Sequence, residues 1–127
     1  MIYEGTIVKV GDNSGALEGR CIRILSPASF HGRRCGDVGS IILLSVTKVL
    51  SNSKIKRGDL LKGLVVRTTR WNKGKIRQKF FENSVVIVKW SVKEGIMPIG
   101  SRIKSPVSES IKRDPSGSLN KVLSIIE

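Results

Sequence analysis

The sequence predicts a mainly β protein, a small closed β-barrel with a projecting basic β-hairpin and short C-terminal helices. Three observations support this fold class. Short stretches alternate between apolar and polar residues, as half-buried strands do. Turn-forming residues separate these stretches at short intervals, and helical periodicity is nearly absent before the C-terminal region. At 127 residues the chain is long enough for one domain with a core, spanning 1–127.

The first two strands are expected at residues 6–10 and 20–24, where apolar and polar side chains alternate. Between them, Gly11 and Gly15 bracket an Asp-Asn-Ser run at 12–14. The short side chains of this run bond to their own backbone and tolerate positive φ angles. The segment therefore indicates a strand, a tight polar turn and a second strand.

Three further strands are expected at 40–47, 60–68 and 84–88. The first of them is a nearly continuous apolar run, which is typical of a strand covered on both faces. Residues 26–36 contain proline and glycine and predict a loop, and 56–59 predict a turn before the next strand.

A projecting basic hairpin is predicted at about 67–81, between two core strands. Its Trp71-Asn72-Lys73-Gly74 segment has a turn signature. Trp71 at the tip either stacks on an unpaired base or packs against its own hairpin. Basic residues crowd the two arms: Arg67, Arg70, Lys73, Lys75, Arg77 and Lys79.

A C-terminal helical segment is predicted at about 105–127. Ser105 followed by Pro106 is typical of an N-cap with proline at the first helical position. Residues 107–112 can form a short helix, and 119–125 suit either another turn or two of helix or a last extended segment.

The charge is the strongest indication of function. Lys and Arg number 23 against 10 Asp and Glu, which gives a net charge of +13. Such a protein favours a polyanionic partner. A membrane surface would require a basic amphipathic helix, and the sequence predicts none. Nucleic acid is therefore the expected partner, with Arg33, Arg34 and the hairpin cations as contacts.

Basic residues inside the expected strands have a simpler interpretation. They interrupt apolar strands at outward positions, where a solvated strand face also discourages edge pairing. Direct contact with nucleic acid is less favoured for each of them: Lys9, Arg20, Arg23, Lys48, Lys62 and Lys89.

The sequence favours neither a metal site nor an enzyme. Cys21, Cys35 and the single histidine, His31, do not supply four ligands in paired short spacings. Cys21 lies in an expected strand and is more simply a small buried apolar group, although a disulfide with Cys35 stays open. Residues 36–39 lack the Lys-Ser/Thr ending of a phosphate loop. No cofactor is expected.

Several segments together resemble a known family. These are the opening segment 2–22, the Lys56-Arg57-Gly58-Asp59 turn, the strands at 63–68 and 83–88, and Ile99-Gly100-Ser101-Arg102-Ile103. In order and spacing they resemble the universal family of the fourteenth protein of the large ribosomal subunit, over essentially the whole chain. Leu17 replaces a usual lysine, Ser105 replaces a usual glycine, and the hairpin is shorter than in bacterial members.

The resemblance implies a structural constituent of the large ribosomal subunit that binds large-subunit rRNA. It also implies a neighbouring large-subunit protein, small-subunit rRNA across an intersubunit bridge, and a ribosome-silencing factor as partners. The expected intersubunit face includes Ser101, Arg102 and Lys121. The expected rRNA contacts are Arg33, Arg34, Lys56, Arg57, Arg67, Arg70, Trp71, Lys73, Lys75, Arg77 and Lys79.

Two alternatives remain at this point. The departures from the family pattern favour a mitochondrial ribosome over a bacterial or plastid one. The alternative function is a free single-strand nucleic-acid-binding protein of the oligonucleotide-binding-fold type. The aromatic content of 5% disfavours that alternative, because such grooves are lined with aromatic stacking platforms.

Overall fold

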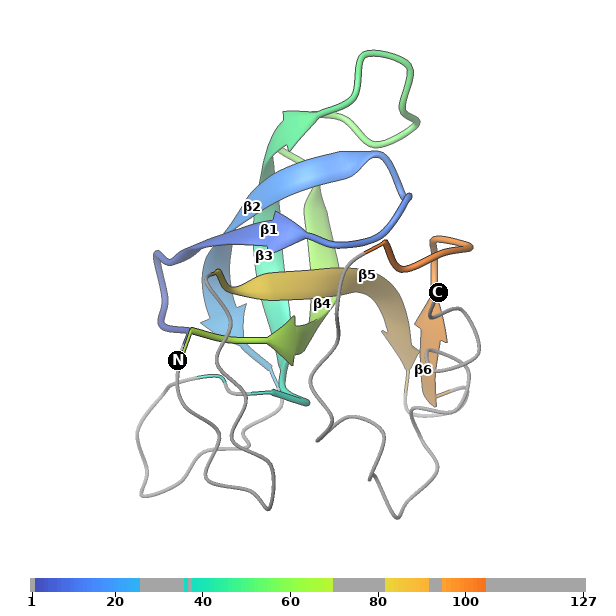
Figure 1. The fold of residues 1–127 in the computed structure, drawn as a ribbon. Coiled ribbons are helices and arrows are strands. Elements are labelled where there is room, and N and C mark those ends of the chain that lie inside the picture. The colour runs from blue at the N-terminus through green and yellow to red at the C-terminus, as the bar shows by residue number, and fades with distance from the viewer. Residues whose placement is uncertain (1, 26–35, 37, 70–81, 92–94, 105–127) are drawn as a thin grey trace.

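The computed structural model describes residues 2–25, 36, 38–69, 82–91 and 95–104 (Figure 1). All regular secondary structure within these residues is β. The strands form one sheet and are, in chain order, β1 (Ile7–Val10), β2 (Ala16–Ile24), β3 (Ile41–Val49), β4 (Leu60–Arg67), β5 (Ser84–Ser91) and β6 (Gly95–Pro98).

The sheet closes on itself through its first and fifth strands. Consecutive strands pair antiparallel from β1 to β6. β1 also pairs in parallel with the start of β5, through Lys9 with Ser84 and Val10 with Val85. The first five strands therefore form a closed barrel, and β6 extends the second half of β5 beyond the ring (Figure 1). The predicted fold class, a small closed β-barrel, is confirmed.

The five barrel strands lie where the sequence predicts them, but two details differ. β2 begins at Ala16, before the expected residue 20, because register shifts after Ala16 and Glu18 let it continue along β3. β6 was not predicted. The expected loop at 26–36, apart from Gly36, the hairpin beyond residue 69, and the helical segment at 105–127 lie outside the described residues.

Two clusters of buried apolar side chains hold the barrel together. One fills the interior and is formed by Ile2, Val8, Ala16, Cys21, Ile42, Leu44, Val46, Val65, Val85 and Ile87. The other includes alternate residues of β4 and β5 and is formed by Ile41, Leu64, Val66, Val86, Val88 and Ile103. β3 supplies Ile42, Leu44 and Val46 to the interior cluster and Ile41 to the other. The remaining outer positions of β3 are half-buried or exposed, so the predicted covering of both faces holds only at the start of the strand.

Leu44 occupies space that two glycines leave open. A Cβ atom at Gly19 on β2 would lie 2.6 Å from Leu44 Cδ1, and one at Gly63 on β4 would lie 2.9 Å from Leu44 Cδ2. Such contacts require the side chain or the backbone to move. The two glycines therefore allow a large interior residue on the strand between them.

Cys21 is a buried free thiol. It lies in the interior cluster with 1% of its surface exposed, and burial raises the pKa of its thiol to about 11. The interpretation of Cys21 as a small buried apolar group is confirmed, and the described structure holds it unpaired. Cys35 lies outside the described residues.

Candidate nucleic-acid interface

The turn between β3 and β4 presents two of the predicted rRNA contacts, Lys56 and Arg57. The Lys56 amide donates to Asp59 Oδ2 at 2.9 Å, and the Asp59 amide donates back to the Lys56 carbonyl at 3.1 Å. Gly58 has a φ of +91° and donates its amide to the Val46 carbonyl at 2.8 Å. The turn is thus tied both to itself and to β3, at the far end of the barrel from the N-terminus (Figure 1).

Both side chains of this turn are exposed, and so is that of Lys54. Ile55, between Lys54 and Lys56, packs against the interior cluster. The alternation therefore directs one apolar side chain inward and two cations outward. Lys54 was not among the predicted contacts, although the same Lys-Ile-Lys alternation could have indicated it.

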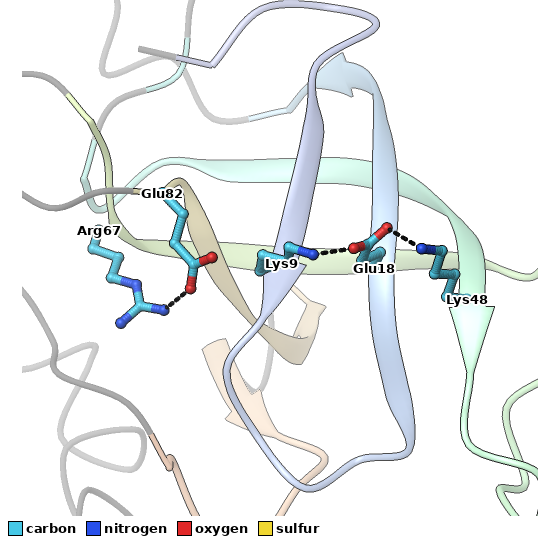
Figure 2. Close-up of polar contacts among 5 residues, drawn as sticks. All are labelled: Lys9, Glu18, Lys48, Arg67 and Glu82. Carbon is cyan, nitrogen blue, oxygen red and sulfur yellow. Dashed lines mark hydrogen bonds and ion pairs between the residues drawn. The ribbon is translucent and has the colours of Figure 1, made fainter.

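Arg67 is placed differently from Lys56 and Arg57. Its side chain is only 10% exposed, and its guanidinium lies 2.5 Å from Glu82 Oε1 (Figure 2). Its Nε donates to the hydroxyl of the fully buried Ser84 at 2.7 Å. Beside it, the Thr69 amide donates to Asn83 Oδ1 at 3.0 Å. Arg67 thus joins the end of β4 to the start of β5.

The remaining predicted contacts lie outside the described residues and stay predictions. They are Arg33, Arg34, Arg70, Trp71, Lys73, Lys75, Arg77 and Lys79, and Lys121 of the intersubunit face.

Glu18 on β2 lies between two lysines of the neighbouring strands (Figure 2). It pairs with Lys9 on β1, and its other carboxylate oxygen lies 3.6 Å from Lys48 Nζ on β3. The hydrogen bond with Lys9 lowers the pKa of the Glu18 carboxyl and raises the pKa of the Lys9 ammonium group. These two lysines are therefore partly neutralised within the protein.

The other strand cations divide into two kinds. Lys62 donates its Nζ to the Trp90 carbonyl at 3.1 Å, and the ammonium lies 5.6 Å from the centre of the Trp90 ring. Arg20, Arg23 and Lys89 are exposed, as expected for a solvated strand face.

The predicted intersubunit residues Ser101 and Arg102 are both exposed and are hydrogen-bonded to the turn between β1 and β2. Asn13 Oδ1 accepts from the amides of Ser101 at 2.8 Å and Arg102 at 3.1 Å. Asn13 Nδ2 donates to Ser101 Oγ at 2.7 Å. Backbone bonds reinforce the contact, from the Asn13 amide to the Arg102 carbonyl and from the Lys104 amide to the Gly11 carbonyl.

Asp12 in the same turn is buried, with 8% of its surface exposed. Its Oδ1 accepts from the amide and hydroxyl of Ser14, and its Oδ2 accepts from the Ile87 amide on β5 at 3.0 Å. Burial raises the pKa of the Asp12 carboxyl, and the hydrogen bonds oppose that rise. The predicted local bonding is confirmed, whereas the bond to β5 was not predicted.

The described part of the chain contains neither a cluster of metal-ligating side chains nor a helix that could span a membrane. No three His, Cys, Asp or Glu side chains gather there as ligands for a metal ion. No helix among those residues has the length and apolar character needed to cross a bilayer.

A comparison with known protein families gives one match of nearly full length. The model of the family described as ribosomal protein L14p/L23e matches residues 1–125. The match includes the Lys56–Arg57 turn, Asn13 and the segment with Ser101 and Arg102, as well as the residues up to 125 that lie outside the described ranges.

Proposed function

The chain belongs to the ribosomal protein L14p/L23e family, and we propose that it binds large-subunit rRNA through cations held on rigid turns of its barrel. The family is one of structural, non-enzymatic ribosomal proteins, which supports a structural role in the large ribosomal subunit. The observation that supports the proposed rRNA contact is the Lys56–Arg57 turn, in which a fixed backbone presents two exposed cations.

The chemistry of this turn suits phosphate. A lysine ammonium is a compact point charge, and an arginine guanidinium can donate two parallel hydrogen bonds to one phosphate. Each phosphate that they neutralise releases condensed counterions, which favours binding at low salt. Because the turn is already ordered by its bonds to Asp59 and Val46, binding needs little further ordering of the backbone.

We propose the same role for the cations of the two segments outside the described residues. These are Arg33 and Arg34 in the 26–36 loop, and the basic residues of the 67–81 hairpin with Trp71 at its tip. The support is their sequence: adjacent arginines in a loop with proline and glycine, and cations on both arms of a turn.

We further propose that Ser101, Arg102 and Lys121 belong to a face that meets small-subunit rRNA in an intersubunit bridge. The support is the family resemblance of this segment and the exposure of Ser101 and Arg102. A neighbouring large-subunit protein and a ribosome-silencing factor are proposed as further partners of the chain. For the ribosome itself we propose a mitochondrial origin, on the departures at Leu17 and Ser105.

The rRNA proposal can be tested with two matched pairs of substitutions. Lys56→Ser with Arg57→Ser removes one lysine and one arginine from the turn. Arg23→Ser with Lys89→Ser removes the same charges from exposed strand positions. We expect the turn variant to bind large-subunit rRNA fragments about thirtyfold more weakly, which corresponds to two hydrogen bonds of about 1 kcal/mol each. The strand variant should bind nearly as the unaltered chain does.

Filter-binding or fluorescence titration at one fixed salt concentration measures both affinities, and thermal melts confirm that both variants fold. Equal weakening of the two variants would show that net charge alone governs binding. That result would remove the turn from the rRNA interface.

A further inference from the structure

Asn13 is the residue through which the start of the chain holds the intersubunit segment. Its side chain makes three hydrogen bonds to Ser101 and Arg102, which lie 88 and 89 positions later in the sequence. Ser101 and Arg102 follow β6, which ends at Pro98, so their amides lie beyond the paired residues of β5 and β6. The Asn13 carboxamide oxygen supplies the acceptor that a strand would otherwise provide.

The contact depends on the side-chain chemistry of Asn13 and on the lack of a side chain at Gly100. Asparagine offers an acceptor and a donor on one short side chain, which matches two backbone amides and one hydroxyl. A Cβ atom at Gly100 would lie 2.8 Å from Asn13 Oδ1 and 3.3 Å from Asp12 Cβ. Only a glycine lets the two segments approach this closely without displacing one of them.

We propose that Asn13 is a positioning residue of the intersubunit face: it fixes the backbone of Ser101 and Arg102 so that the Arg102 guanidinium is presented to an RNA phosphate. This inference rests on the proposed function of that face. It adds to this face a residue from the opposite end of the chain, which the segment at 101–104 alone does not contain.

The chemistry of the surroundings favours RNA as the partner. Arg102 and Lys104 are both exposed on this short segment, in a chain with a net charge of +13. A fork of two hydrogen bonds from guanidinium to phosphate depends on the orientation of the arginine. A backbone held in place before binding reduces the ordering that binding requires, so it strengthens the contact without touching the RNA itself.

The test combines a local measurement on the protein with a functional one on the ribosome. Asn13→Ala removes all three side-chain bonds, whereas Asn13→Asp keeps the acceptor for the two amides. Asn52→Ala, in the exposed turn after β3, is the matched control. Amide hydrogen exchange is followed by NMR at Ser101 and Arg102, with Ile87 as an internal reference because Asp12 holds its amide.

We expect Asn13→Ala to speed exchange at Ser101 and Arg102 by about three- to tenfold, the factor expected for one hydrogen bond of ordinary net strength. Exchange at Ile87 should not change. Asn13→Asp should stay close to the unaltered chain, and Asn52→Ala should have no effect. Large subunits that carry Asn13→Ala should contain the protein in normal amounts but join small subunits more weakly in light-scattering titrations. Arg102→Glu should weaken joining at least as much.

The outcomes separate this inference from the function on which it rests. Unchanged exchange at Ser101 and Arg102 in Asn13→Ala would overturn the positioning role. The positioning role would also be overturned if Asn13→Ala speeds exchange but its subunits join normally, while Arg102→Glu still weakens joining. If Arg102→Glu itself leaves joining unchanged, the proposed intersubunit face is wrong and the inference fails with it. If subunits with Asn13→Ala join small subunits normally but no longer bind an acidic protein factor, the face binds a protein partner. That result would overturn the choice of RNA.

Discussion

Arg67 shows how burial changes the role of a cation. In the sequence it is one of several basic residues near the 67–81 segment, and it was predicted to contact rRNA. In the structure its guanidinium is bonded to Glu82 and to the buried Ser84 hydroxyl. A guanidinium held in this way joins two strands, and we propose that Arg67 supports the rRNA-binding surface by stabilising the barrel.

This role predicts a loss of stability and not a direct loss of RNA contact. Arg67→Met should lower the free energy of unfolding by about 1–3 kcal/mol, because the buried Ser84 hydroxyl loses its bonded partner. Arg23→Met, at an exposed position on β2, should change stability by no more than about 0.5 kcal/mol. Denaturant unfolding of the full chain measures both. Unchanged stability of Arg67→Met with weaker rRNA binding would favour the direct contact instead.

At the scale of the strand, the fit of β3 between β2 and β4 depends on two glycines. Gly63→Ala places a methyl group 2.9 Å from Leu44 Cδ2 and 3.2 Å from Val85, in the barrel interior. We expect this overpacking to cost about 1–3 kcal/mol of stability. The midpoint of denaturant unfolding should fall while its slope stays constant, since the extent of burial does not change.

Two further variants test whether contact with Leu44 causes the loss of stability in Gly63→Ala. At Gly36 an added Cβ would meet no atom closer than 3.6 Å, so Gly36→Ala is the control and should cost little. Leu44→Ala should cost about 2–5 kcal/mol by itself. Combined with Gly63→Ala it should cost less than the sum, because each substitution provides the space that the other needs. Strict additivity would show that Leu44 is not what Gly63 accommodates.

The sequence predicts the barrel strands because their signal is local. Either alternation or a short continuous apolar run marks each of the first five strands, whichever strand becomes its neighbour. β6 has no such signal: it is four residues long, ends in Pro98, and has no fully buried residue. Its position depends on hydrogen bonds to β5, which pattern analysis of the segment alone does not contain.

Among the described site residues, the sequence indicates the position only of those that do not depend on distant contacts. Lys56 and Arg57 are exposed on a turn that the sequence identifies. Arg67 could not be placed in this way, because β4 packs apolar residues on both faces and the register shifts beside Arg67. The contacts of Asn13 and Asp12 join residues 75 to 89 positions apart, so turn chemistry explains their local bonds but not their distant ones.

At the scale of the whole molecule, the net charge of +13 predicts strongly salt-dependent binding. We expect the logarithm of the rRNA association constant to fall with the logarithm of salt concentration with a slope of about −4 or steeper, since each neutralised phosphate contributes about −0.7 to −0.9. Removing Lys56 and Arg57 should make the slope shallower by about 1.4 to 1.8, which corresponds to two phosphate contacts. Binding titrations at several salt concentrations measure this slope for the unaltered chain and for the variant. A slope near zero would show that electrostatic attraction does not drive binding.

The parallel pairing of β1 with β5 also bears on the order in which the barrel can form during synthesis. β1 ends at Val10, but its partner on the closing side begins at Ser84. One edge of β1 therefore stays unpaired until most of the chain has left the ribosome that makes it, and open strand edges promote aggregation. The Lys56–Arg57 turn requires only β3 and β4, so it can form earlier. We expect a nascent chain that can already bind RNA while its barrel is open, which makes early capture by rRNA a means of protecting it.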